Sequence, residues 1–353
     1  MTQLHPDTPP AATAMAIVPL PPELQRWLVN HVPGFAGPGI MRPLEGGQSN
    51  PTFLIEADSG LLVLRRRPLG QVLPSAHAVD REYRVMRALQ GGPVPVPRVH
   101  GLCMDTGLLG SAFYVRDHVP GRVFWDPRLP GFSRDERGAL FAAMGRTLAE
   151  LHSLDPAALA LEGFGRPGNY LARQVARWTR QYRASETEPI PAMDRLIAWL
   201  PEHLPAEGKT RLIHGDYRLD NLILHPAMPR ISAVIDWELS TLGDPRADVA
   251  YHALCWHFTP ELFHGLHGAD LADLGIPDQM AYLDGYIQAG GTDPRSDWQF
   301  LVALCMFRLA AIMQGIARRA IEGNAKSAEA GLIGAKAAPV AALGWALAQG
   351  ARR

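Results

Sequence analysis

The chain has 353 residues, with 34 basic and 35 acidic side chains and a formal net charge of -1. Lysines are scarce: none precedes Lys209, which excludes a phosphate-binding lysine and a P-loop from the first 208 residues. The near-neutral charge argues against a dedicated nucleic-acid binder. Three cysteines without a CxxC pair are typical of a reducing compartment, so we expect a cytoplasmic protein. The longest apolar stretch, near 337–348, is too short for a membrane span.

The first third of the chain predicts a small β-rich lobe. Residues 1–20 are rich in Pro and Ala and predict a mobile N-terminal tail. Apolar residues then recur at helical spacing, and two strand-like runs flank the turn formers at 58–60. The expected elements are a helix at 21–32, strands at 52–57 and 61–66, a helix at 77–90, and strands at 98–103 and 112–118. We take 21–118 as this lobe.

From about residue 133 the pattern becomes mainly helical, after a hinge at 119–121. Two short apolar runs, 211–213 and 231–235, predict strands that interrupt the helices. The helices are expected at 134–152, 170–182, 193–200, 248–257, 279–289, 297–321 and 325–349. Residues 119–353 therefore predict a second, larger and mainly helical lobe.

The segment with most chemical information is HGDYRLDN at 214–221, followed by IDWE at 235–238. This order and spacing of acids and amide is typical of phosphoryl transfer on a kinase-like scaffold. Asp216 would accept or orient a hydroxyl proton, while Asn221 and Asp236 offer the hard oxygen ligands that Mg²⁺ prefers. The alternative is that both motifs are ordinary turns with capping aspartates.

A kinase-like scaffold also needs a cation on a strand, paired with an acid on the next helix. Arg65 ends the strand at 61–66, and alternation places Val63 on the same face, where Val63 would cover an adenine. Glu82 is the expected partner of Arg65, because arginine binds both phosphate and carboxylate through its fork. Arg66 and Arg67 compete for this role, and a solvated arginine cluster is the alternative.

A glycine-rich turn, GGQSN at 46–50, lies between two expected strands. Backbone N–H groups of Gly46 and Gly47 and the hydroxyl of Ser49 would cover the phosphates of a nucleotide. A plain hairpin explains the same pattern equally well when the turn is considered alone.

Five runs, GGQSNPTF, VLRRRP, SAHAVDREY, HGDYRLDN and IDWELSTLGDPRADVAY, resemble the aminoglycoside-phosphotransferase-like, or kinase-like, superfamily. They are most similar to the kinase-like domains fused to, or encoded beside, some acyl-CoA dehydrogenases, over about residues 25–345. The resemblance implies an α+β, protein-kinase-like two-lobe fold, ATP and Mg²⁺ as cofactors, and a functional link to an acyl-CoA dehydrogenase. It departs from the wider superfamily in having Arg65 where lysine is usual.

The resemblance also implies roles for individual residues. Asp216 corresponds to the catalytic aspartate, and Asp248 to the acid that braces the catalytic loop. Asn221 and Asp236 correspond to the metal ligands. Glu82 corresponds to the helix partner of the strand cation, and backbone groups of Asp117, His118 and Val119 would meet the adenine.

We therefore expect an ATP- and Mg-dependent phosphotransferase that acts on a hydroxyl of a small molecule. Only eleven residues separate Asp236 from Asp248, too few for the long activation loop of a protein kinase. Arg173, Arg177 and Arg180 share one face of a helix and would form an anion-binding wall, although a solvated face is the alternative.

The substrate stays open at this point. Resemblance to the subgroup implies a hydroxyacyl-CoA or related acyl compound, whose anionic groups would suit the arginine wall. An aminoglycoside or another small alcohol is one alternative. A non-catalytic nucleotide-binding module is a second alternative, motivated by the missing lysine. We expect no nucleic-acid or membrane partner.

Overall fold

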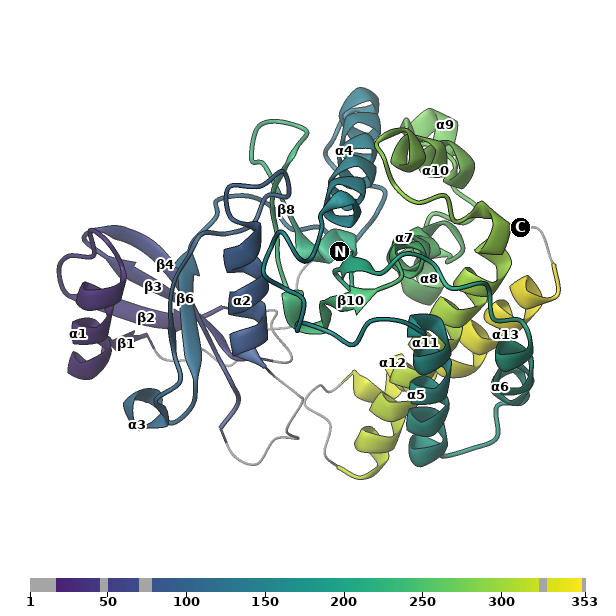
Figure 1. Ribbon diagram of the computed structural model, residues 1–353, viewed down its shortest axis with the longest axis horizontal. Helices are drawn as coiled ribbons and strands as arrows, with labels where there is room; N and C mark the ends of the chain where they lie inside the picture. The colour runs from purple at the N-terminus through teal and green to yellow at the C-terminus, as the bar shows by residue number, and fades with distance from the viewer. Residues whose placement is uncertain (1–16, 45–49, 70–77, 324–328, 351–353) are drawn as a thin grey trace, which may run out of the picture. The chain divides into compact units, whose positions relative to one another are not determined.

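The computed structural model describes residues 17–44, 50–69, 78–323 and 329–350 (Figure 1). These residues form two compact units. Unit 1 takes its residues from 1–87 and 97–118, and unit 2 takes its residues from 88–96 and 119–353. The predicted phosphate-covering residues Gly46, Gly47 and Ser49 lie outside the described residues.

Unit 1 is built on a six-stranded sheet in which all neighbouring strands are antiparallel. Strands 52–57 and 61–66 are confirmed almost to the residue, joined by a turn in which Gly60 has φ 118°. The strand order is β1 (Val18–Pro19), β2 (Gly39–Pro43), β3 (Thr52–Ala57), β4 (Gly60–Arg66), β6 (Phe113–Asp117) and β5 (Val99–Cys103).

The two faces of this sheet have different chemistry. Helix α1 (Pro22–His31) packs on one face, where Leu24 and Leu28 join Ile55 and Leu64 in an apolar core. Helix α2 (Val79–Leu89) lies on the opposite side, as Figure 1 shows, and contributes Glu82 to a polar face. A short helix, α3 (Thr106–Leu109), connects β5 and β6.

Strand β1 lies within the segment 1–20 that the sequence predicts to be a tail. It pairs with β2, and Leu20, which follows it, is buried against the α1 core. A strand of two residues is too short to produce an alternating pattern, so no periodicity predicts it.

Unit 2 is mainly helical, and this composition, together with the β-rich unit 1, confirms the predicted fold class. Its apolar core surrounds α11 (Trp298–Ile321), which packs against α5 (Tyr170–Ser185), α7 (Pro245–His252) and α13 (Ala337–Ala348). The helices are α4 (Arg134–Ser153), α5 (Tyr170–Ser185), α6 (Pro191–Glu202), α7 (Pro245–His252), α8 (Pro260–Phe263), α9 (Leu271–Leu274), α10 (Gln279–Gln288), α11 (Trp298–Ile321), α12 (Ala330–Gly334) and α13 (Ala337–Ala348).

Two antiparallel strand pairs interrupt the helices and frame the segment 214–221. Strand β7 (Arg211–Ile213) pairs with β10 (Thr241–Gly243), and β8 (Leu222–Leu224) pairs with β9 (Ile231–Val234). The segment 214–221 therefore begins where β7 ends and finishes where β8 begins.

The predicted helix at 325–349 is wrong as a single element. Among the residues described there, α12 ends at Gly334 and α13 begins at Ala337. Pro339 has no N–H to continue the helical hydrogen bonds across this break. Gly334 also lets the backbone approach α11 closely, because an added Cβ would lie 2.6 Å from the Cβ of Ala317.

Among the residues that the structure describes, two helical segments are long and apolar enough to cross a membrane by length and composition alone, Arg295–Ile321 and Ala330–Ala348. The first is more apolar than the second, which contains the apolar stretch near 337–348. Its most apolar window is 72% buried in the structure, and α11, which makes up most of it, is the central helix of the unit 2 core. Burial of this kind is typical of a core helix.

Candidate active site

The segment 214–221, here called the catalytic loop, is held by one buried carboxylate. Asp248 of α7 accepts the backbone N–H of His214 at 2.7 Å and that of Gly215 at 2.8 Å, one on each oxygen. Gly215 has φ 80°, and an added Cβ would lie 2.5 Å from the carbonyl oxygen of Leu239. The loop can therefore turn toward Asp248 only with glycine at this position.

Asp248 is itself supported by a chain of two polar side chains that the sequence analysis missed. The Nε2 atom of His152 lies 3.3 Å from Asp248, and its Nδ1 atom lies 2.8 Å from the hydroxyl of Tyr286. Burial raises the pKa of Asp248, but its hydrogen bonds to the His152 side chain and to the His214 backbone help to outweigh burial and lower it. Asp248 is therefore ionised, and it holds the loop as a charged acceptor.

Asn221 lies beside Asp216 within the same loop. Its amide nitrogen donates to the backbone carbonyl of Asp216 at 2.8 Å and to the Oδ2 atom of Asp216 at 3.1 Å. Both amide hydrogens are thereby directed at Asp216. The amide oxygen of Asn221 therefore points away from these contacts, as a neutral ligand atom should.

Two arginines set the charge of Asp216. The Nε atom of Arg218 lies 3.4 Å from its Oδ1 atom, and Arg308 of α11 donates to the Gly215 carbonyl at 2.7 Å. Burial raises the pKa of Asp216, but the charges of Arg218 and Arg308 outweigh it and hold the pKa below its usual range. Asp216 is therefore a carboxylate at neutral pH.

Asp236 follows β9 in a left-handed conformation, with φ 63° and ψ 60°. This conformation costs a residue other than glycine about 1–3 kcal/mol, so the surroundings must enforce it. His214 makes a 3.0 Å hydrogen bond through Nε2 to the carbonyl of Ile235, and its Nδ1 atom accepts the N–H of Asp216. Trp237 is fully buried and donates to the Val234 carbonyl. His214 thus ties the catalytic loop to the residue before Asp236.

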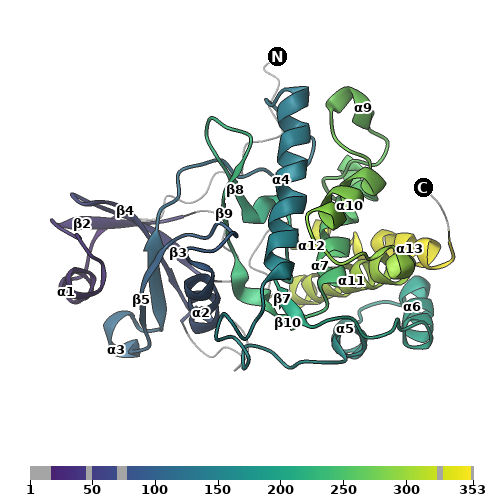
Figure 2. The same ribbon diagram turned by 45° about the horizontal axis from the view of Figure 1, so that its top comes forward.

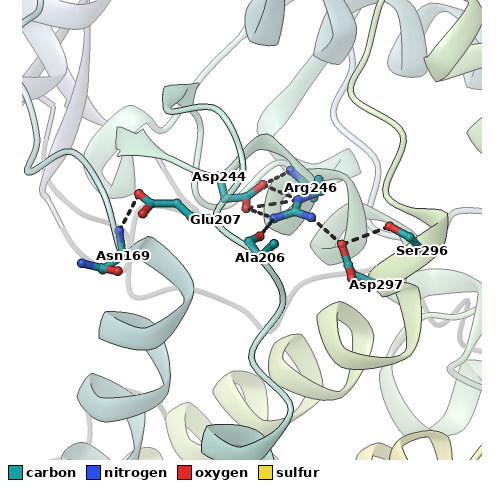
Figure 3. A network of polar contacts seen from close by, with 7 residues as sticks. All are labelled: Asn169, Ala206, Glu207, Asp244, Arg246, Ser296 and Asp297. Carbon is teal, nitrogen blue, oxygen red and sulfur yellow. Dashed lines mark hydrogen bonds and ion pairs between the residues drawn. The ribbon is translucent and has the colours of Figure 1, made fainter.

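A polar network fixes the N-terminus of α7, one turn before Asp248 (Figure 3). Asp244 caps this helix by accepting the backbone N–H of Arg246. It also forms an ion pair with the guanidinium of Arg246, with a nitrogen–oxygen distance of 2.6 Å. Arg246 reaches the Ala206 carbonyl and Asp297, so it joins three segments that are distant in the sequence. Asp244 and Arg246 are buried, and their pairing holds the start of the helix that carries Asp248.

The predicted cation–acid pair is present in unit 1. The Nε atom of Arg65 lies 3.1 Å from the Oε2 atom of Glu82, and both side chains are buried. Asn50 and Tyr114 also donate to Glu82, at 2.9 Å and 3.0 Å. Arg66 instead donates to the Leu109 carbonyl and lies over the ring of Phe53. Strand alternation therefore selects Arg65 over its neighbour.

Val63 shares the face of β4 with Arg65 and is buried. The strand register adds Arg116, which lies opposite Val63 in the pairing of β4 with β6 and which no sequence pattern predicted.

The residues predicted to meet the adenine make backbone contacts within unit 1. Asp117 donates its N–H to the Arg98 carbonyl, and His118 donates its N–H to the Leu61 carbonyl. The side chain of Asp117 pairs with His100 at 2.6 Å, and Val119 is the first residue of the second segment of unit 2.

The three predicted substrate arginines of α5 differ from one another. Arg173 donates to the Arg166 carbonyl at 2.6 Å, whereas Arg177 and Arg180 are exposed. The guanidinium of Arg177 lies over the ring of Trp178, and the loss of solvent there, then the charge of Arg308, lowers the pKa of Arg177. Glu207 accepts the N–H of Asn169 at the N-terminus of this helix (Figure 3). Of the three arginines, Arg177 thus interacts electrostatically with Arg308, and Arg308 contacts the catalytic loop.

The chain belongs to the phosphotransferase enzyme family, whose model matches residues 40–301. It is 44% identical over 347 residues to acyl-CoA dehydrogenase family member 10 of Mus musculus, covering 96% of this chain and 32% of that protein. It is 39% identical over 335 residues to mouse member 11, covering 92% of this chain and 43% of that protein. The chain therefore spans about a third to two fifths of the curated relatives it matches.

A solved structure of similar length supports the same family. A protein from Ralstonia eutropha JMP134, provisionally named as an aminoglycoside phosphotransferase, is 47% identical with a TM-score of 0.86, covering 94% of this chain and 98% of that one. A microcompartment-associated aminopropanol kinase (TM-score 0.61, 21% identity) and the aminoglycoside phosphotransferase APH(4)-Ia, solved with AMP-PNP and hygromycin B (TM-score 0.59, 15% identity), share the fold.

Proposed function

We propose that this protein is a small-molecule kinase that transfers the terminal phosphoryl group of ATP to a hydroxyl of its substrate. The observation that supports it best is the arrangement in unit 2. An ionised Asp216 lies beside Asn221 on a loop whose backbone is held by the buried carboxylate of Asp248. A turn with capping aspartates would not require a second acid and a histidine to fix the loop backbone.

Asp216 is the proposed catalytic residue. Its carboxylate would accept a hydrogen bond from the acceptor hydroxyl and take up the proton as the oxygen–phosphorus bond forms, while the bond from the γ-phosphorus to the bridging oxygen of ATP breaks and ADP leaves. Arg218 and Arg308 keep the carboxylate ionised, and Asp248 keeps the loop backbone in place. Because phosphoryl transfer depends mainly on positioning and charge, this rigidity is an important part of catalysis.

Unit 1 is proposed to bind the nucleotide. Val63 would cover the base, and the terminal nitrogens of Arg65 would contact the phosphates while Nε holds Glu82. The ATP analogue found with the more distant APH(4)-Ia supports ATP as the donor. Arg116, on the same face as Val63, would contribute a second positive charge near the base.

Mg²⁺ suits the donor atoms that unit 2 presents. Asn221 directs its amide nitrogen toward Asp216, so the amide oxygen is available, and Asp236 adds a carboxylate from a strained backbone position. Hard oxygen donors of this kind are the ligands that Mg²⁺ prefers. When bound with ATP, Mg²⁺ would neutralise charge on the phosphates.

The proposed acceptor is a hydroxyacyl-CoA or a related anionic acyl compound. Similarity to two acyl-CoA dehydrogenase family members supports an acyl substrate and a functional link to a dehydrogenase. Exposed Arg177 and Arg180 would favour an anionic substrate over a polycationic aminoglycoside.

An acceptor screen tests this proposal. Purified protein with Mg²⁺ and γ-labelled ATP would be incubated with hydroxyacyl-CoAs, free hydroxy acids, amino alcohols and aminoglycosides, and products would be identified by mass spectrometry. We expect label in a hydroxyacyl product, and none with Asp216→Asn. Label only in an aminoglycoside or amino alcohol would overturn the acyl substrate, and label in none of them would favour a nucleotide-binding module.

A further inference from the structure

Unit 2 contains a groove away from the catalytic loop, which we call the α4–α10 groove. It has a volume of about 660 Å³ and lies between α4 and α10, which run side by side in both views (Figures 1 and 2). Gly138, Ala142 and Gly145 line it from α4, and Ala281 and Gly285 line it from α10. Small residues on both helices thus leave space that larger side chains would fill. This volume falls in the range of small-molecule sites.

The charges that line the groove have one sign. Arg134 and Arg146 of α4 line it, and none of its lining residues is acidic within the described chain. These arginines are about 18 Å apart along the helix at 1.5 Å per residue. Arg134 already donates through Nε to the Ala272 carbonyl, whereas the side chain of Arg146 is exposed. An elongated molecule with an anionic end and an apolar body would complement this lining.

Tyr282, which also lines the groove, provides a second and independent indication of a ligand. The residue is 3% exposed, and its hydroxyl has no hydrogen-bond partner among the described residues. Its ring lies against Trp256, with centroids 4.9 Å apart, and an added Cβ on Gly145 would lie 3.7 Å from its hydroxyl. A buried hydroxyl without a partner is rare and marks a place where a water or ligand atom belongs.

The groove is connected to the catalytic loop by direct contacts. Tyr286 lines it, and the Tyr286 hydroxyl bonds to His152, which in turn contacts Asp248. Asp248 accepts the N–H groups of His214 and Gly215. Tyr286 is fully buried beneath the groove, so a molecule that packs against α10 would restrain Tyr286 and, through His152, the acid that holds the loop.

We propose that the α4–α10 groove binds a small anionic molecule with an extended apolar body, of the fatty-carboxylate type, and that its binding stabilises the catalytic loop through Tyr286. The anionic end pairs with Arg146, and the apolar chain lies along the small residues of both helices, beside the ring of Tyr282. Ligand binding in the groove does not depend on the proposed kinase activity. Only the effect of a stabilised loop on catalysis rests on that activity.

Binding is tested with 11-(dansylamino)undecanoate, whose fluorescence increases in an apolar site, and with decanoate or decanol as competitors. Ala142→Leu fills the groove, and Ala139→Leu is the matched control, because Ala139 is an exposed α4 alanine outside the lining. We expect saturable binding that Ala142→Leu weakens about tenfold or more and Ala139→Leu leaves unchanged. Arg146→Gln should weaken competition by decanoate but not by decanol. Absence of saturable binding, or equal binding by both leucine variants, would overturn the site.

The connection to the loop is tested by hydrogen exchange, which needs no turnover. Decanoate should slow exchange of the His214 and Gly215 amides in the wild-type protein. Tyr286→Phe keeps the ring but removes the hydroxyl bond to His152, so this variant should bind the probe without protecting the loop. Equal protection of the His214 and Gly215 amides in both proteins would overturn the connection between groove and loop. An acceptor screen that gives no product would not change the outcome of this experiment.

Discussion

Arg65 and Glu82 form a buried ion pair in unit 1, with Nε and Oε2 separated by 3.1 Å. The first 208 residues contain no lysine, so arginine is the permanently charged group available for this position. Glu82 is held from two further sides by Asn50 and Tyr114, which fixes the guanidinium on the face that carries Val63. The pair places a cation on the strand that is proposed to bind nucleotide.

Replacing Arg65 should affect both stability and nucleotide binding. Arg65→Met leaves Glu82 buried without its cation, and we expect a loss of about 3–5 kcal/mol in the free energy of unfolding. Arg65→Lys keeps the charge but loses the fork, so it should recover most of this stability while binding Mg-ATP less tightly. Urea unfolding and calorimetric titration with Mg-ATP measure the two effects. Arg66→Lys is the control, and equal ATP affinity in Arg65→Met and wild type would contradict the assignment.

The pKa of Asp216 predicts the acid limb of the pH–rate profile. Arg218 lies 3.4 Å from this carboxylate and is among the charges that lower its pKa. Replacing Arg218 with Gln removes that charge, so the pKa should rise and the acid limb of kcat/KM should move to higher pH. Arg211→Gln, on the neighbouring strand, is the control. An acid limb at the same pH in Arg218→Gln and wild type would show that Asp216 is not the titrating base.

His252 predicts the acid sensitivity of the fold. Burial among Tyr217, Trp256 and Tyr282 lowers its pKa to about 4, below the value of about 6.5 expected in the unfolded chain. The neutral ring therefore contributes its full stability above pH 6.5, and this contribution is lost as the pH falls toward 4.

A His252→Phe variant removes this titration. Relative to the variant, the wild-type protein should lose about 2–3 kcal/mol of unfolding free energy between pH 7 and pH 4.5. Urea unfolding at several pH values measures the difference. His203→Gln, at an exposed histidine, should instead follow the wild-type pH dependence. Parallel curves for wild type and His252→Phe would contradict the prediction.

The arginines of α5 should contribute unequally to an anionic substrate. Arg177 interacts electrostatically with Arg308, which contacts the catalytic loop, whereas Arg173 is engaged with the Arg166 carbonyl. Arg177→Ala should therefore raise KM for a hydroxyacyl-CoA several-fold, with kcat nearly unchanged. Arg173→Ala should have a smaller effect. Steady-state kinetics separate the two parameters, and an unchanged KM in Arg177→Ala would mean that this face is merely solvated.

Much of the site could be predicted because its residues directly follow strands that can be recognised in the sequence. HGDYRLDN and IDWE follow short apolar runs, so the positions of Asp216 and Asp236 at strand ends follow from the pattern alone. Alternation along β4 also selected Arg65, because only one face of a strand can meet the next helix.

The residues that the sequence did not reveal act from a distance. His152 and Arg308 are buried or partly buried polar residues of α4 and α11, and only tertiary packing brings His152 to Asp248 and Arg308 to the Gly215 carbonyl of the catalytic loop. Arg116 required the register between β4 and β6, which no local pattern specifies. That the Tyr282 hydroxyl has no partner among the described residues follows only from the three-dimensional structure around it.

The most direct measurement of the central proposal compares wild-type protein with Asp216→Asn. Both would be assayed for transfer of the γ-phosphate of ATP to the best acceptor and, separately, for Mg-ATP binding. We expect the variant to bind Mg-ATP as the wild type does and to lose about 10²–10⁴-fold in kcat. If Asp216→Asn transfers phosphate at the wild-type rate, Asp216 is not the catalytic residue and the account of this site is wrong.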